Sequence, residues 1–99
     1  MKRNIFQTKT PEQGETFKLL LEHKNIKIER ITSSDKIPDK VYEQKQDEWV
    51  LLLKGSAKLD LDGKMIEIKE GDTLFIPSGQ KHKVLETKAG TVWLAVHIF

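Results

Sequence analysis

The chain has 99 residues, of which 17 are lysine or arginine and 15 are aspartate or glutamate, so its formal net charge is +2 at pH 7. It contains no cysteine, which excludes disulfides, zinc–thiolate sites and a thiol nucleophile. The two signs of charge are interspersed and no basic cluster alternates with aromatic residues, so we expect no nucleic-acid partner. The longest apolar run, residues 49–53, is too short to cross a bilayer. We therefore expect one soluble, cytoplasmic domain over residues 1–99 without a membrane partner.

Most apolar residues of the first half recur with a period of two, which is typical of strands covered on one face. We expect an irregular segment over residues 1–14, a strand over 15–23 with a turn at 23–25, and a second strand over 26–31. Residues 33–46 are polar, contain Pro38 and predict a long loop. This loop leads into an apolar strand that begins at Glu48 and ends at Gly55.

The second half alternates short apolar segments with turn signals. Residues 57–61 and 65–68 flank Asp62-Gly63 and predict a hairpin. Further strands are expected at 74–76, at a segment that His82 enters, and at 91–98. Short strands with turns every eight to twelve residues predict an all-β fold with antiparallel strands, either a sandwich or a barrel.

A carboxylate and an imidazole stand at two of these strand entrances. If the first strand extends back to Gln44, alternation places Gln44 on the same face as Glu48, and it also places His82 and Glu86 on one face. Glu48 and His82 could then meet inside a small barrel and act as an acid–base pair. The alternative is that both are ordinary polar residues, one solvated and one bonded to the backbone at a strand end.

The spacing of the turn residues resembles that of a known family. The pattern G-x5-P-x-G-x2-H of the second cupin motif is met by Gly71, Pro77, Gly79 and His82, and the E-x6-G that ends the first motif is met by Glu48 and Gly55. Residues 47–50 (DEWV) and 93–97 (WLAVH) also resemble the small, single-domain, RmlC-like cupins. This resemblance implies a double-stranded β-helix, a jelly-roll barrel with a metal or ligand pocket in its mouth.

The chain departs from the cupin pattern where metal ligands are expected. Tyr42 and Gln44 stand where the first motif carries two histidines. The resemblance therefore implies a metal set of Gln44, Glu48 and His82, with Tyr42 at the place of a fourth ligand. A divalent Mn, Fe, Ni or Zn ion is the implied cofactor, and an oxygen-rich set with one imidazole favours the harder ions.

Two classes of function are compatible with these residues. One is an enzyme in which a metal or the pair of Glu48 and His82 acts catalytically on a small polar substrate, for instance as an isomerase or epimerase. The other is a metal-free cupin that binds a small ligand as a sensor or carrier, and the sequence leaves open whether the protein is an enzyme. Tyr42 and Arg30 are further ligand-binding candidates, with Arg30 suited either to an anionic group or to a surface salt bridge.

The last strand and the strand after Glu48 are apolar on both faces. Trp93 and His97 alternate with an aliphatic set, and the sequence leaves open which of the two faces looks inward. We favour the aliphatic set in the core with Trp93 and His97 outside, and the alternative is that Trp93 and His97 line the pocket. Trp49 is expected to project away from Glu48. An antiparallel strand that is apolar on both faces needs cover on both, so the sequence predicts a homodimer.

Overall fold

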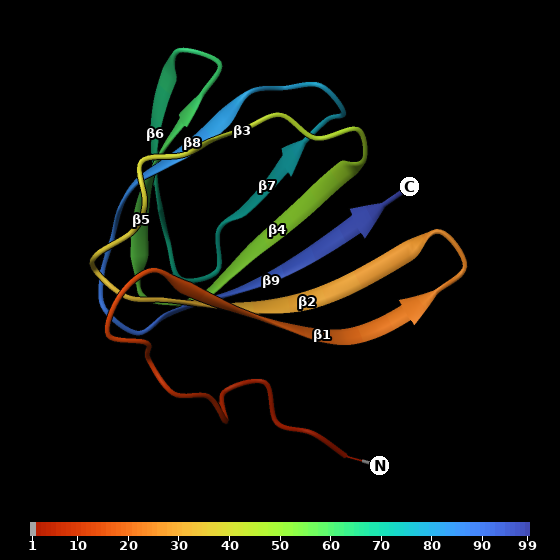
Figure 1. Ribbon diagram of the computed structural model, residues 1–99, viewed down its shortest axis with the longest axis vertical. Coiled ribbons are helices and arrows are strands. Elements are labelled where there is room, and N and C mark those ends of the chain that lie inside the picture. Colours follow the sequence, from red (N-terminus) through yellow and green to blue (C-terminus); the bar gives the residue numbers. More distant parts are fainter. Residues whose placement is uncertain (1) are drawn as a thin grey trace.

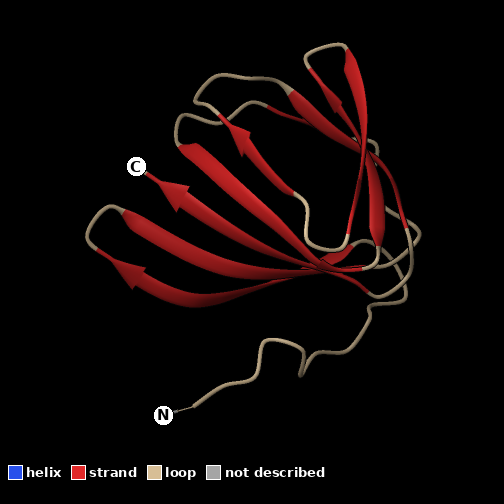
Figure 2. Cartoon of the chain, turned by 180° about the vertical axis from the view of Figure 1, so that it is seen from behind, coloured by secondary structure: helices blue, strands red, loops and turns tan. Residues whose placement is uncertain are grey.

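The computed structural model describes residues 2–99 and contains nine strands, with no helix in the described part of the chain (Figure 2). The strands are β1 (Glu15–His23), β2 (Ile26–Ser33), β3 (Val41–Tyr42), β4 (Asp47–Lys54), β5 (Ser56–Leu61), β6 (Lys64–Lys69), β7 (Thr73–Ile76), β8 (His82–Thr87) and β9 (Thr91–Ile98). Nothing within residues 2–99 could therefore cross a membrane as a helix.

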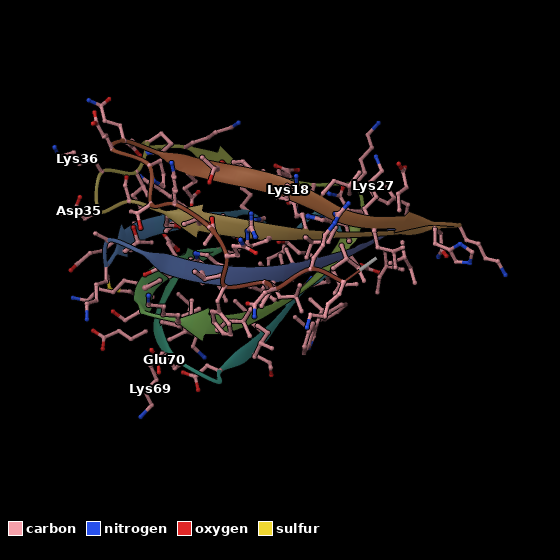
Figure 3. The ribbon with its side chains drawn as sticks, turned by 90° about the horizontal axis from the view of Figure 1, so that it is seen from below. Lys18, Lys27, Asp35, Lys36, Lys69 and Glu70 are labelled. Carbon is pink, nitrogen blue, oxygen red and sulfur yellow. The ribbon has the colours of Figure 1, made fainter. Side chains whose placement is uncertain are left out.

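The strands form two antiparallel sheets that face each other. One sheet has the order β1-β2-β9-β4-β7 and the other has the order β3-β8-β5-β6. Figure 3 shows the larger sheet from below, with its strands side by side in orange, gold, blue, green and teal. The sheets lie close together near β5 and diverge towards the β1–β2 hairpin (Figure 1). The prediction of an all-β antiparallel jelly roll is confirmed.

The β5–β6 hairpin follows directly from its turn residues. Asp62 and Gly63 both have positive φ, 51° and 91°, the backbone that a two-residue hairpin turn requires. The Asp60 carboxylate accepts a hydrogen bond from the Gly63 amide at 2.8 Å. The hairpin predicted from Asp62-Gly63 is therefore confirmed.

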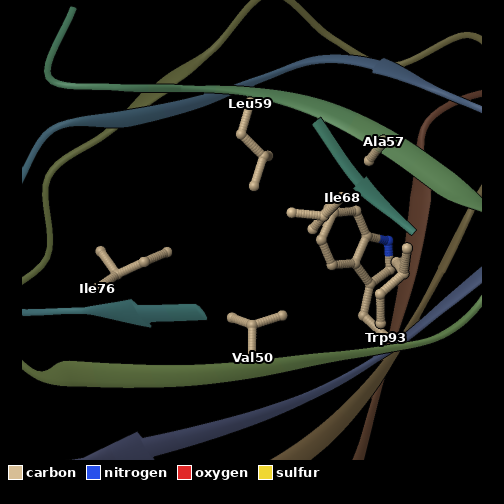
Figure 4. Packing of buried hydrophobic residues seen from close by; sticks show 7 residues of the cluster. Val50, Ala57, Leu59, Ile68, Ile76 and Trp93 are labelled. Atoms are coloured by element: carbon tan, nitrogen blue, oxygen red, sulfur yellow. The ribbon is translucent and has the colours of Figure 1, made fainter. Parts of the chain in front are cut away.

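The core lies between the two sheets and is built by alternation. In β4 the buried positions are Glu48, Val50 and Leu52, while Trp49 lies on the opposite face as predicted. The core cluster consists of Val50, Leu52, Ala57, Leu59, Ile68, Ile76 and Trp93. Figure 4 shows Val50 and Trp93 from one sheet pointing towards Leu59 of the other. Apolar burial between the sheets is thus what positions the strands that carry the site.

Two local features differ from the sequence prediction. The expected loop over residues 33–46 contains the strand β3, which pairs with β8 through Tyr42 and His82. A two-residue strand has no periodicity that a sequence could reveal. In addition, β8 changes register against β5 at Leu59, so Glu86 turns outward and pairs with Lys58. The expectation that Glu86 shares the face of His82 is wrong, because one extra residue in a β-bulge reverses the alternation.

The outer face of the larger sheet carries a continuous apolar row. Adjacent positions in the strand pairings place Leu21, Ile28, Val96, Trp49 and Phe75 side by side across all five strands. The two residues at the ends of the row, Leu21 and Phe75, are 52% and 53% exposed. We call these five residues the outer row.

Candidate functional site

A cavity of about 90 Å³ opens between the two sheets where they diverge. Its floor is mostly aliphatic and its rim is polar, as expected of a small-molecule site. The residues that line it are Glu15, Phe17, Glu29, Ile31, Tyr42, Gln44, Glu48, Val50, Leu59, Leu74, Ile76, His82, Val84, Trp93 and His97. Four of the five candidate residues predicted from the sequence, Tyr42, Gln44, Glu48 and His82, therefore lie around one cavity, with the two sheets contributing one wall each.

Glu48 and His82 face each other across the cavity from opposite sheets. Glu48 is 6% exposed and His82 is 8% exposed. The His82 Nε2 atom lies 3.9 Å from the Glu48 Oε1 atom, which is too long for a direct hydrogen bond. The amide of Gln44 donates to the same Oε1 atom at 2.8 Å, although Gln44 precedes the start of β4. The structure thus brings together the three residues that the resemblance marked as metal ligands.

The protonation of the His82 ring follows from its backbone partner. Its Nδ1 atom lies 3.2 Å from the carbonyl oxygen of Gln80. A carbonyl oxygen can only accept, so Nδ1 carries a proton, and in the neutral tautomer this leaves the lone pair on Nε2. Within residues 2–99, neither His82 Nε2 nor Glu48 Oε2 has a hydrogen-bond partner, and no side-chain polar atom sealed from solvent lacks one. Both atoms are therefore open to the cavity.

Tyr42 covers the His82 ring at the entrance of the cavity, which we call the mouth. The two rings stack with their centroids 5.5 Å apart and an interplanar angle of 20°. Burial, together with the negative charges of Glu15 and Glu48, raises the pKa of the Tyr42 phenol above its usual range. The phenol is therefore neutral at physiological pH, and a neutral phenol is a weak metal ligand.

His97 points into the cavity and is bonded at both ring nitrogens. Its Nε2 atom lies 3.0 Å from Glu29 Oε1, and its Nδ1 atom lies 3.2 Å from the Gln46 amide nitrogen. Trp93, on the same face of β9, is 4% exposed in the core. The expectation that Trp93 and His97 lie outside is wrong. Its premise, that the aliphatic set of β9 must face the core, fails because both faces of the larger sheet are apolar.

Sequence reasoning missed Glu29 as a residue of the site. It alternates with Ile28 on β2, and only the pairing of β2 with β9 brings it beside His97. The signal that could have found it is alternation. Ile31 lies on the core side, so a residue two positions earlier on the same strand shares its face.

A chain of hydrogen bonds connects the core to the rim of the cavity. The indole nitrogen of Trp93 donates to the Ser33 hydroxyl oxygen at 2.9 Å, and this hydroxyl in turn donates to the Glu15 carboxylate. Burial raises the pKa of the Glu15 carboxyl above its usual range, and the bond from Ser33 opposes this shift in part. Glu15 is thus a partly desolvated acid whose bonded partner is a neutral hydroxyl.

Arg30 is not part of this cavity. Its guanidinium donates to the carbonyl oxygens of Ile5 and Gln7 at 3.4 and 3.2 Å. Because Arg30 follows Glu29 on β2, alternation turns it to the outer face of the sheet, where it holds the N-terminal segment. Arg30 therefore binds the backbone of the N-terminal segment and does not line the mouth.

The pair of His97 and Glu29 predicts a pH-dependent contribution to stability. The hydrogen bond to Glu29 raises the pKa of His97, burial opposes the shift, and Glu48 adds to it. A raised pKa in the folded state gives stability that is complete below the unfolded pKa of about 6.5 and is lost as pH rises through the folded pKa. Thermal melts of His97→Gln should therefore show a loss relative to wild type that is largest near about pH 6 and shrinks towards about pH 9.

The control for this experiment is His23→Gln, because His23 is exposed at the end of β1. Its melting temperature should follow that of the wild type at every pH. If the loss caused by His97→Gln were constant over the whole pH range, the ion pair would not be the source of the contribution, and packing alone would explain it.

The comparisons with known proteins agree with this geometry. Residues 30–97 match the model of the cupin domain family. A structure from Ralstonia eutropha JMP134, named a "putative mannose-6-phosphate isomerase", is similar at 37% identity with a TM-score of 0.90, covering 99% of this chain and 97% of that one. A cupin superfamily protein from Desulfitobacterium hafniense DCB-2 is similar at 19% identity with a TM-score of 0.85, covering 96% and 86%.

A conserved protein of unknown function from Streptococcus pyogenes is similar at 18% identity with a TM-score of 0.84, covering 99% of this chain and 86% of that one. At this identity the likeness concerns the fold alone. A search of curated proteins finds no match. The family match covers more than half of the chain, and it agrees with the two motifs and with the jelly-roll topology, so the chain belongs to the cupin family.

Proposed function

We propose that the barrel mouth binds a small polar ligand directly through Glu48 and His82, without a resident metal ion between them. The observation that carries this proposal is the pair of open atoms on two buried side chains. Glu48 and His82 are both more than nine-tenths buried, and each keeps one polar atom free towards the cavity. Both atoms are open to the cavity, and a ligand that pairs with them gains charge-assisted hydrogen bonds in a site sheltered from solvent.

The donor set fits a resident metal poorly. Within residues 2–99 there is no group of three histidine, cysteine, aspartate or glutamate side chains placed to hold a metal ion. The Gln44 amide directs its NH₂ group at Glu48, and His97 is engaged at both nitrogens. One imidazole and one carboxylate remain, whereas catalytic zinc sites take three protein ligands. The set of Gln44, Glu48 and His82 therefore supports a metal-free mouth better than a metal centre.

A second candidate function is acid–base catalysis of isomerisation. It is favoured by the 37% identity to the protein from Ralstonia eutropha named as an isomerase, together with the free lone pair of His82 Nε2. This nitrogen can accept a proton from a bound substrate, and Glu48 on the opposite wall can hold the resulting imidazolium. The phosphate group of the substrate in that name has no lysine or arginine partner among the described residues that line this cavity.

Site-dependent ligand stabilisation tests the proposed function. Compounds that raise the melting temperature of the wild-type protein should bind at least about tenfold more weakly to Glu48→Gln, since a hydrogen bond to a charged group is lost. The matched control is Glu67→Gln, which removes the same charge from an exposed position on β6. Equal responses of both variants to every stabilising compound would place ligand binding outside the mouth and contradict the proposal.

A further inference from the structure

On the basis of the proposed function, we infer that the ligand of the mouth is a small organic ammonium ion with a short apolar stem. This inference rests on the polar atoms left free in the cavity, on the charges of the residues that line it, and on its aromatic and aliphatic walls.

The free polar atoms of Glu48 and of the neutral tautomer of His82, the two most buried ionisable residues of the site, are both acceptors. His82 donates from Nδ1 to the Gln80 carbonyl, so in its neutral tautomer Nε2 holds the lone pair. Glu48 Oε2 belongs to a carboxylate whose other oxygen already accepts from Gln44. A ligand that pairs with both atoms must therefore bring hydrogen-bond donors, and a primary ammonium group brings three.

The charges that line the cavity favour a cation over an anion. Three carboxylates, those of Glu15, Glu29 and Glu48, face it, and no lysine or arginine within residues 2–99 lines it. His97 partners the carboxylate of Glu29, whereas Glu15 is bonded to the hydroxyl of Ser33. The nearby Lys40 does not line the cavity, and its nitrogen lies over the Tyr42 ring, 4.7 Å from the ring centroid. A cationic ligand would therefore meet the carboxylates of Glu15 and Glu48, which no lysine or arginine of the cavity lining neutralises, and an anion would be repelled.

The walls and the size of the cavity restrict the rest of the ligand. The aromatic side chains of Phe17, Tyr42 and Trp93 line it, and aromatic faces attract ammonium ions. The floor consists of aliphatic side chains such as Val50 and Ile76. The cavity volume is about 90 Å³, the space of roughly three water molecules in the liquid. An ammonium head on a stem of a few carbons meets all three conditions.

Three probes that share an isopropyl group and differ in charge test this inference: isopropylammonium, 2-propanol and isobutyrate. The readout is the indole N–H signal of Trp93 in ¹⁵N-labelled protein at neutral pH, with Trp49 on the outer face as the internal reference. We expect isopropylammonium to shift the Trp93 signal and to bind at least about tenfold more tightly than either other probe. This preference should fall about tenfold in Glu48→Gln, and it should be unchanged in Glu67→Gln.

The possible outcomes separate this inference from the proposed function. If isobutyrate or inorganic phosphate binds as tightly as isopropylammonium, or if 2-propanol matches it, the ammonium inference is overturned while a ligand-binding mouth remains. If isopropylammonium leaves Trp93 unshifted at millimolar concentration while other compounds still stabilise the protein through Glu48, the ammonium inference alone is again overturned. If no compound acts through Glu48, the proposed function itself fails.

Discussion

Replacement of Gly55 by alanine is expected to destabilise the protein by about 3–5 kcal/mol. Gly55 ends β4 with φ of +96°, a backbone that side chains rarely adopt. A Cβ atom here would lie 2.9 Å from the Thr91 Cα atom and would also collide with the Thr91 hydroxyl. Because the obstruction is partly backbone, β4 and the start of β9 would have to separate. Denaturant unfolding followed by circular dichroism measures the loss.

Gly79→Ala is the matched control, because it separates backbone strain from steric collision. Gly79 has φ of +82°, but a Cβ atom placed on it meets nothing within 4 Å. The substitution should therefore cost only about 1–2 kcal/mol, the strain of the left-handed backbone. Equal losses at the two glycines would show that the close approach of Thr91 does not explain the role of Gly55.

The outer row is expected to form the contact between two copies of this chain, which is our proposal for the predicted homodimer. Leu21, Ile28, Val96, Trp49 and Phe75 make an apolar line across all five strands of the larger sheet. The accessible surface of the protein is 6604 Å², whereas a compact monomer of 11.4 kDa exposes about 5,800 Å². The excess is close to the roughly 800 Å² that one partner buries in a standard interface.

Trp49→Arg should separate the copies. A large aromatic near the centre of an interface contributes at least about 2 kcal/mol, so the dissociation constant should rise about 30-fold or more. Light scattering after size-exclusion chromatography should give a mass near twice 11.4 kDa for the wild type and near 11.4 kDa for the variant. Met65→Arg changes an exposed apolar residue on β6, outside the outer row, and should leave the dimer intact. A wild-type monomer at micromolar concentration would contradict the proposal.

Much of the fold could be predicted from the sequence, because it rests on local rules. Alternation located the two faces of β4, and Asp62-Gly63 located the hairpin. The position of Glu86 could not be predicted, since the bulge in β8 arises from how β8 pairs with β5 rather than from a local pattern. The strand β3 escaped prediction for a similar reason, because two residues are too few to show a period.

The candidate site could be predicted only in part. The motif spacing led to Glu48 and His82, and the structure places them across one cavity. Of the second pair, Glu29 was missed although its alternation with Ile31 could have located it, whereas His97 could not be placed, since the inner and outer faces of β9 are both apolar in sequence. The choice between them depends on how the larger sheet packs, and that packing turns Trp93 and His97 inward.

The central claim is that the mouth acts without a resident metal, and elemental analysis of protein purified without chelators or a metal-binding tag tests it most directly. We predict far less than one equivalent of manganese, iron, nickel or zinc per chain, together with a melting temperature that added divalent ions leave unchanged. A metal present at about 100 times its dissociation constant would raise the melting temperature by on the order of 10 °C. Close to one equivalent of metal, lost in Glu48→Ala and in His82→Ala, would contradict the claim and restore the metal centre that the family resemblance implied.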